Sequence, residues 1–175
     1  MPGETSAESY ELCIMRHGIA VDRAPGPAPD DSKRSLTPEG RERMRQIARG
    51  LAATGFSPDW VVASPYLRAA ETAEIVAASC GAGVQLDLCE ALEPGGSVAD
   101  LLVFLGRRAQ RRRVLVVGHE PGLSDLAANL TGAGRRANFA FKKGGCCLLA
   151  FDEFPPQSPG RLVWWLTPRV LRKLA

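Results

Sequence analysis

The sequence predicts an α/β fold in which a mostly parallel mixed sheet forms the middle layer of a three-layer α/β/α sandwich. Short apolar runs at residues 10–15, 60–63 and 114–117 are typical of buried strands. Amphipathic segments with helical spacing alternate with these runs, as crossovers between parallel strands require. Two later runs, 146–151 and 162–166, follow each other without a helix between them, and this predicts that the sheet is mixed.

The length of 175 residues is typical of one domain, and we assign residues 10–175 to it. Residues 1–9 are polar and acidic and lack the basic and apolar regions of a signal peptide, so we expect a disordered lead-in there. No apolar window is long enough to cross a bilayer, so no membrane association is expected. A formal net charge of +3 gives no argument for nucleic-acid binding. The expected location of the protein is the cytoplasm.

Cysteine and arginine are both clustered. The five cysteines include the adjacent Cys146 and Cys147, show no metal-ligand spacing, and are expected to be reduced, buried thiols. Five arginines lie within residues 107–113, just before an apolar strand. The favoured interpretation of this cluster is a solvated helix end, and the alternative is a binding surface for a polyanion or a charged partner.

Helices are predicted where capping residues precede apolar residues at helical spacing. Thr37 followed by proline predicts the start of the first helix, and Ser64 followed by proline predicts the next helix by the same capping chemistry. Between the first strand and the first helix, residues 19–35 are rich in proline and show no periodicity, which predicts a loop over the site. A weak strand is expected at residues 84–88. Further helices are expected to begin at Ser97, Pro121 and Pro168.

The only two histidines of the chain follow two of the predicted strands. His17 comes after residues 10–15 within Arg16-His17-Gly18, and His119 follows residues 114–118. Because ligands bind at the carboxyl ends of strands in open α/β sheets, we expect the two imidazoles to lie together at such an edge. Arg68 falls in the first turn of a predicted helix, next to N–H groups and a positive dipole end that favour anions.

Two guanidinium groups and two imidazoles together predict a pocket for a phosphoryl group. Guanidinium groups match phosphate oxygens and offset the charge of the transition state. Nearby positive charges disfavour protonation of an imidazole, so its lone pair stays available for nucleophilic attack. The residues therefore indicate covalent catalysis without a metal or other cofactor, because the arginines supply the positive charge.

Four short motifs stand at the predicted strand ends and helix starts. They are Arg16-His17-Gly18, Leu36-Thr37-Pro38-Glu39-Gly40, Ser64-Pro65-Tyr66-Leu67-Arg68-Ala69-Ala70-Glu71-Thr72-Ala73 and Val117-Gly118-His119-Glu120-Pro121. In this order they resemble the histidine phosphatase superfamily, also called phosphoglycerate mutase-like, and the resemblance extends from Leu12 to Pro168. The compact turn at 92–96 and the ending at 164–168 look most like the small bacterial phosphohistidine phosphatases of SixA type.

The resemblance implies a phosphoglycerate mutase-like fold and a role for each motif. It implies that His17 is the nucleophile, that Arg16 and Arg68 bind the phosphoryl oxygens, and that His119 donates a further hydrogen bond to them. In the small subgroup an arginine of the loop before the Leu-Thr motif also reaches the phosphate, and Arg34 matches that position. The implied substrate is a phosphohistidine on a protein, such as a phosphorelay partner.

The chain departs from the larger members of the superfamily at the general acid. Those members carry a glutamate or aspartate on an inserted segment that this chain lacks, and Glu90 and Glu93 are the nearest candidates, with Glu90 favoured. A site without a dedicated acid suits a leaving group that departs easily, such as the imidazole of phosphohistidine. The alternatives are a small-metabolite phosphomonoesterase and a non-catalytic phospho-ligand binding module. A mutase is disfavoured by the missing insert.

Overall fold

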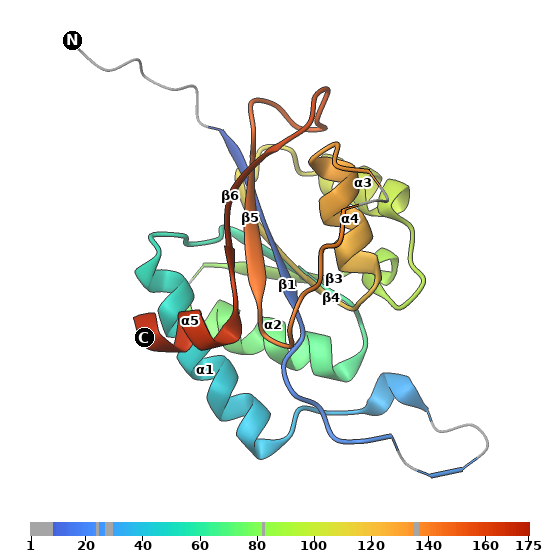
Figure 1. The fold of residues 1–175 in the computed structure, drawn as a ribbon, viewed down its shortest axis with the longest axis vertical. Helices are drawn as coiled ribbons and strands as arrows, with labels where there is room; N and C mark the ends of the chain where they lie inside the picture. The colour runs from blue at the N-terminus through green and yellow to red at the C-terminus, as the bar shows by residue number, and fades with distance from the viewer. Residues whose placement is uncertain (1–8, 24, 27–29, 82, 135–136) are drawn as a thin grey trace.

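A six-stranded sheet forms the middle of the computed structural model, which describes residues 9–23, 25–26, 30–81, 83–134 and 137–175 (Figure 1). The strand order is β3-β2-β4-β1-β5-β6. The first four of these pair in parallel, whereas β5 is antiparallel to both β1 and β6, so the mostly parallel mixed sheet is confirmed. The strands are β1 (Tyr10–Arg16), β2 (Trp60–Ala63), β3 (Gln85–Leu88), β4 (Arg113–Gly118), β5 (Cys146–Phe151) and β6 (Arg161–Leu166).

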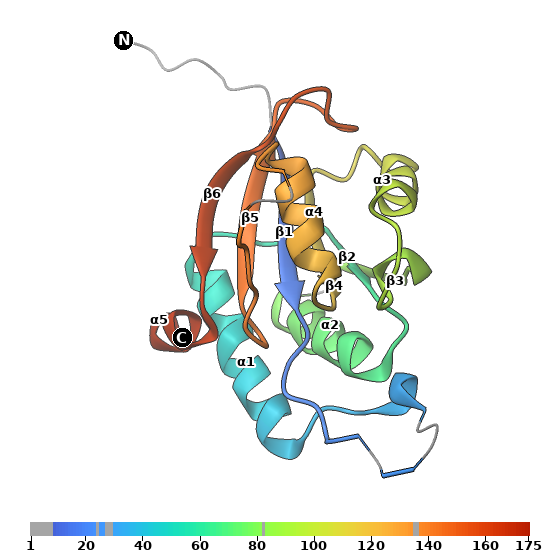
Figure 2. The ribbon, with the colours of Figure 1, turned by 45° about the vertical axis from the view of Figure 1, so that its right-hand side comes forward.

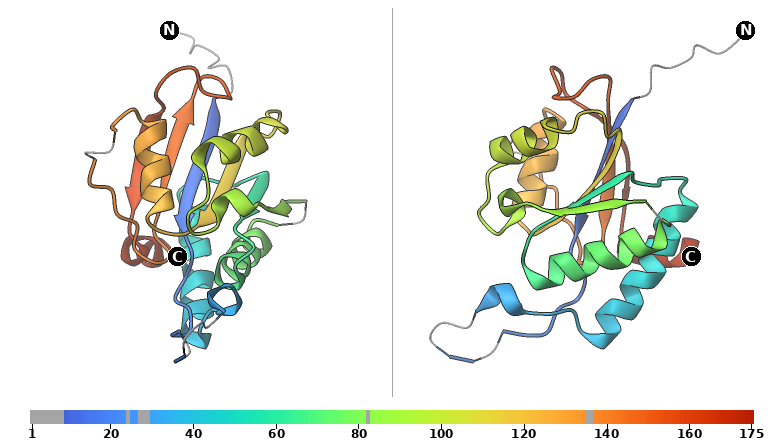
Figure 3. Two further views of the ribbon diagram at one scale, coloured as in Figure 1. Left: turned by 90° about the vertical axis from the view of Figure 1, so that its right-hand side faces the viewer. Right: turned by 180° about the vertical axis from the view of Figure 1, so that it is seen from behind.

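Helices cover both faces of the sheet, which confirms the three layers (Figures 1 and 3). The helices are α1 (Pro38–Ala53), α2 (Leu67–Ser79), α3 (Val98–Gly106), α4 (Gly122–Leu130) and α5 (Pro168–Leu174), with short 3-10 helices η1 (Asp31–Lys33) and η2 (Glu90–Leu92). Successive side chains of a strand point to opposite faces. In β1, Cys13 and Met15 therefore pack with α1, α2 and α5, and Leu12 and Ile14 pack with α3 and α4.

The predicted helix caps are confirmed at α1 and α3 and are wrong at α2. Thr37 accepts a hydrogen bond from the backbone N–H of Gly40, and Ser97 likewise caps α3. By contrast, α2 begins at Leu67 after an N-cap residue whose side chain makes no capping hydrogen bond. Ser64 lies too far before that first turn, and its hydroxyl instead contacts His119 in the candidate site.

The structure corrects one expectation about the cysteines and leaves the expectation about residues 1–9 largely untested. Four cysteines are buried thiols as expected, but Cys80 follows the last residue of α2 at the surface and is partly exposed. The predicted lead-in at residues 1–9 lies, apart from Ser9, outside the described residues. Within the described part of the chain, no helix combines the length and apolar character that crossing a membrane requires.

The arginine cluster runs from Arg107, the C-cap of α3, to Arg113, the first residue of β4, whereas His119 follows the end of that strand. Arg113 pairs with Glu11 of β1 at 2.9 Å, and Arg108 pairs with Asp87 of β3 at 2.9 Å. These two arginines therefore bind carboxylates of neighbouring strands. The helix-end position that the sequence favoured is what the structure shows for Arg107, the C-cap of α3. Arg108 and Arg113 are paired in addition, because the tertiary structure brings acidic strand residues beside them.

Candidate active site

The register of the sheet brings three strand ends together. Arg16, the last residue of β1, is paired with Gly118, the last residue of β4, and β2 ends next to them. The residues that follow these strands are His17, His119 and Ser64. The predicted convergence of distant motifs at one edge of the sheet is therefore what the structure shows. Figure 2 shows the chain leaving the sheet at the arrowhead of β1 and passing below α2 to η1.

The two hydrogen bonds of the His17 ring define its tautomer. Nδ1 lies 2.7 Å from the carbonyl oxygen of Gly18, which can only accept, so Nδ1 carries the proton. Nε2 lies 3.3 Å from Nε of Arg68, which can only donate, so Nε2 carries the lone pair. Burial, together with the charges of Arg68 and Arg16, lowers the pKa of His17 to about 3 and outweighs the opposing bond to Gly18. His17 is therefore neutral at physiological pH.

His119 lies beside His17, with ring centroids 5.0 Å apart. Its Nε2 is 2.9 Å from the Ser64 hydroxyl, which also accepts the N–H of Tyr66. Its buried Nδ1 has no hydrogen-bond partner among the described residues. Burial and the charge of Arg68 lower the pKa of His119 to about 4. The second imidazole is thus neutral as well.

The three predicted arginines differ in their present partners. Arg68 is 4% exposed, and both of its terminal nitrogens donate to Asp31. Arg34 donates to the same carboxylate, which brings it next to Arg68. Arg16 donates through Nη1 to the carbonyl of Phe141 at 2.8 Å, and its buried Nε has no partner among the described residues. The charge of Arg16 acts on both histidines, since it lowers the pKa of each.

A buried threonine joins the end of β1 to α2. The Thr72 hydroxyl accepts the N–H of Gly18 at 3.0 Å and donates to the carbonyl of Arg68 at 2.7 Å. Gly18 also allows α1 to approach, because a Cβ at this position would lie only 2.7 Å from Cγ of Met44. Through Thr72, the residue after His17 is hydrogen-bonded to the first turn of α2, which carries Arg68.

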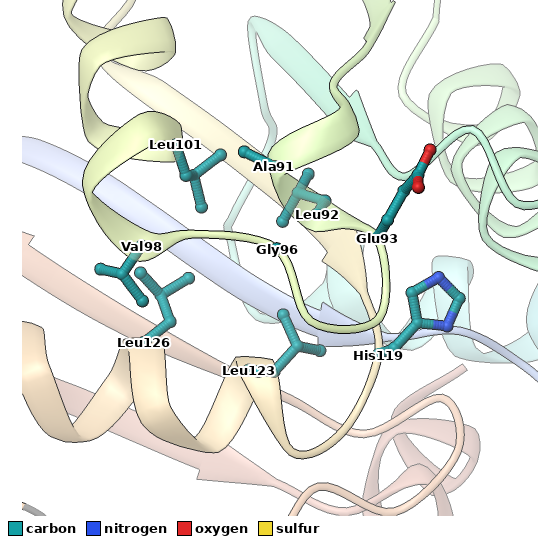
Figure 4. A pocket seen from close by; sticks show the side chains of 10 residues that line it. Ala91, Leu92, Glu93, Gly96, Val98, Leu101, His119, Leu123 and Leu126 are labelled. Carbon is teal, nitrogen blue, oxygen red and sulfur yellow. The ribbon is translucent and has the colours of Figure 1, made fainter.

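The two candidate acids lie on different surfaces. Glu93 and His119 both line a small pocket whose other walls come mostly from apolar side chains of η2, α3 and α4 (Figure 4). Glu90 is exposed and lines a separate open groove that includes Asp100 and Arg107. Of the two carboxylates, Glu93 is the one that shares a pocket with a candidate histidine. Among the described residues, no group of three His, Cys, Asp or Glu side chains is placed to hold a metal ion.

Sequence reasoning missed two residues that contact the site. Asp31 was passed over as part of a proline-rich loop, although the charged run Asp30-Asp31-Ser32-Lys33-Arg34 next to the Leu-Thr motif was a signal that could have identified it. Thr72 stands within the motif of residues 64–73, but the sequence assigns it no role in the site. Its spacing of four residues from Arg68 predicts contact along the helix, but its bond to Gly18 is visible only in the tertiary structure.

Comparison with known sequences gives three relevant matches. Residues 12–93 match the family model described as histidine phosphatase superfamily, branch 1. An uncharacterized protein of Picosynechococcus is 35% identical over 137 residues, which cover 77% of this chain and 81% of that protein. The phosphohistidine phosphatase SixA of Escherichia coli K12 is 32% identical over 123 residues, which cover 69% of this chain and 73% of that protein.

Solved structures share the arrangement of strands and helices. The protein histidine phosphatase SixA complexed with tungstate superimposes with a TM-score of 0.78 at 28% identity, covering 92% of this chain and 99% of that one. A mycobacterial glucosyl-3-phosphoglycerate phosphatase gives a TM-score of 0.68 at 16% identity, covering 91% of this chain and 99% of that one. The second likeness shows the fold alone. Together they confirm the fold predicted from the sequence.

Proposed function

The chain belongs to the histidine phosphatase superfamily, branch 1, and is a phosphatase. From this premise we propose that it forms a covalent phosphohistidine on His17 without a metal ion. We propose as well that its substrate is a phosphohistidine of a protein. The observation that carries the proposal is the state of the His17 ring. Nε2 is unprotonated at neutral pH and directs its lone pair at the N–H of Arg68, beside the second neutral imidazole. A nucleophile needs this combination of availability and adjacent positive charge.

The proposed reaction has two displacements at phosphorus. In the first, Nε2 of His17 forms a bond to phosphorus while the bond to the leaving group breaks, and that bonding pair goes to the leaving atom. In the second, water forms a bond to phosphorus, the P–N bond breaks, and its electron pair returns to Nε2. The net reaction consumes one water and yields phosphate and the protonated leaving group.

The surrounding donors hold the phosphoryl oxygens in this proposal. Arg68 donates to Nε2 of His17, the charge of Arg16 acts on the same ring, and Arg34 stands next to Arg68. If the Ser64 hydroxyl donates to Nε2 of His119, the proton of that ring lies on Nδ1, which is the nitrogen without a protein partner. His119 then donates a hydrogen bond to an oxygen whose charge grows in the transition state.

A phosphohistidine substrate is supported by the named relatives and by the leaving group. The E. coli relative is a phosphohistidine phosphatase, and the SixA structure with tungstate is named a protein histidine phosphatase. An imidazole leaves more readily than an alkoxide and makes less demand on a general acid. Glu93 lines the pocket with His119 and is the better placed of the two candidate acids for substrates that need a proton.

The nucleophile is tested by turnover and by trapping. The purified protein is expected to hydrolyse para-nitrophenyl phosphate in the presence of a chelator, and His17→Ala is expected to abolish this activity. Rapid quench with labelled substrate should trap an adduct that is labile in acid and stable in alkali, as a phosphoramidate is. Activity that survives in His17→Ala, activity that requires a metal ion, or an acid-stable adduct would overturn the mechanism.

The substrate class is tested by comparing rates. We expect a higher kcat/KM on a phosphohistidine-bearing protein than on sugar phosphates or nucleotides, with His17→Ala as the control in each case. Higher rates on one of the metabolites would favour the phosphomonoesterase alternative. Binding of tungstate without turnover of any substrate would favour the non-catalytic binding module.

A further inference from the structure

One carboxylate joins three arginines beside the candidate nucleophile. Oδ1 of Asp31 accepts from Nε of Arg23 at 3.0 Å and from Nη1 of Arg34 at 2.8 Å, and Oδ2 accepts from Nη2 of Arg68 at 2.9 Å. The backbone carbonyl of Asp31 also accepts from Nη1 of Arg68 at 2.8 Å. Asp31 therefore links the loop that carries Arg34 to the helix that carries Arg68.

These contacts fix the orientation of the Arg68 guanidinium. The group is planar, and Asp31 holds both of its terminal nitrogens, which leaves Nε facing Nε2 of His17. Because the Arg68 guanidinium is planar and is held at Nη1 and Nη2, its remaining N–H bonds have defined directions. Asp31 thus determines how Arg68 presents its donors to a phosphoryl group on His17.

The carboxylate also offsets repulsion between cations that must stand close together. Arg34 and Arg68 approach the same carboxylate from opposite oxygens, and like charges at such separations repel unless an anion lies between them. Burial alone raises the pKa of Asp31, but the hydrogen bonds from Arg34 and Arg68 outweigh it and hold the pKa below its usual range. The side chain is 21% exposed, so solvent screens this pairing only in part.

We propose that Asp31 is a positioning residue that assembles Arg34 and Arg68 into one binding site for the phosphoryl group. The inference rests on the proposed function, because it takes those two arginines as phosphoryl ligands. The opposite role for the same carboxylate is that of an internal anion that competes with phosphate for Arg68. Removal of the Asp31 charge should weaken phosphate binding if Asp31 positions the arginines, and should strengthen phosphate binding if Asp31 competes with phosphate.

The test removes the charge of Asp31 and measures binding as well as turnover. Asp31→Asn is expected to raise the Kd for inorganic phosphate and to lower kcat/KM for para-nitrophenyl phosphate, each by about tenfold, the usual effect of losing one charge-assisted hydrogen bond. The matched control is Asp30→Asn, since Asp30 is the adjacent carboxylate and contacts only Ser32 and Lys33 among the described residues. The control should stay within about twofold of the wild type, because asparagine also caps a helix turn.

Two further variants separate positioning from a general loss of structure. Asp31→Glu keeps the charge and should recover part of the phosphate affinity. In an Arg34→Ala background, Asp31→Asn should have a smaller effect than in the wild type, because Asp31 acts partly through Arg34. Tighter phosphate binding in Asp31→Asn, or full additivity with Arg34→Ala, would overturn the inference.

Failure of this inference is distinguishable from failure of the proposed function. If His17→Ala abolishes turnover while Asp31→Asn behaves like Asp30→Asn, the nucleophile stands and the positioning role is wrong. If the wild type is inactive or His17→Ala stays active, the proposed function is wrong. The phosphate Kd measures the role of Asp31 without depending on turnover.

Discussion

Replacement of Thr72 by valine tests whether the link between β1 and α2 determines the geometry of the site. The change removes one hydroxyl and retains the branched shape. It leaves the buried N–H of Gly18 without its acceptor, and the carbonyl of Arg68 loses one of its donors. An unsatisfied buried donor costs about 1–3 kcal/mol. We therefore expect the free energy of unfolding to fall by about 2 kcal/mol, which for a chain of this size lowers Tm by about 4–8 °C.

Activity should fall more than this loss of stability explains. Without the Thr72 hydroxyl, the position of His17 relative to Arg68 is less restricted, and small misplacements of reacting groups are costly. At a temperature where the variant remains folded, kcat/KM for para-nitrophenyl phosphate should be lower by about tenfold, or about 1.4 kcal/mol in transition-state stabilisation. Thr72→Ser, which restores the hydroxyl, should recover most of this activity.

Thr131 provides a matched control for this prediction. Its hydroxyl also donates to the carbonyl four residues earlier, that of Ala127, but no distant N–H of the described residues donates to it. Thr131→Val should change Tm slightly and leave kcat/KM unchanged. If Thr72→Val and Thr131→Val show the same Tm and the same kcat/KM, the bond from Gly18 to Thr72 does not determine the geometry of the site.

The remaining predictions concern pH and helix packing. Because the pKa values of His17 and His119 are lowered to about 3 and about 4, NMR should show neither ring titrating between about pH 5 and 8, and a midpoint near 6.5 would contradict the burial argument. Below about pH 6.5 the unfolded state therefore binds more protons than the folded state. The free energy of unfolding, measured in urea, should then decrease as the pH falls below about 6.5, and a value that stays constant would refute the link between histidine protonation and stability. Gly50→Ala would place Cβ 1.8 Å from the carbonyl oxygen of Leu171 and should destabilise the contact of α1 with α5 by about 1–3 kcal/mol. Gly122→Ala, which meets no atom within 4 Å, is its control, and equal Tm values would exclude tight packing at Gly50.

The sequence alone was sufficient for features that depend on neighbouring residues. The strands at Trp60–Ala63 and Cys146–Phe151 have the predicted bounds, and Thr37 caps α1 as expected. Apolar runs and capping residues act over one or two turns, so their signal lies in consecutive residues. The convergence of His17 and His119 also followed from the sequence, because parallel strands end at a common edge.

Contacts between distant segments were decided only by the tertiary structure. Ser64 was predicted as a helix cap, yet its hydroxyl contacts His119, and Asp31 was passed over, yet it joins two candidate phosphoryl ligands. Such partners depend on how the loop before α1 lies against α2, which no local pattern encodes. The sequence by itself determined which side chains reach the edge of the sheet. The packing of the loop and helices around that edge decided their orientation, charge state and hydrogen-bond partners, because burial and hydrogen bonding arise only when separate segments meet.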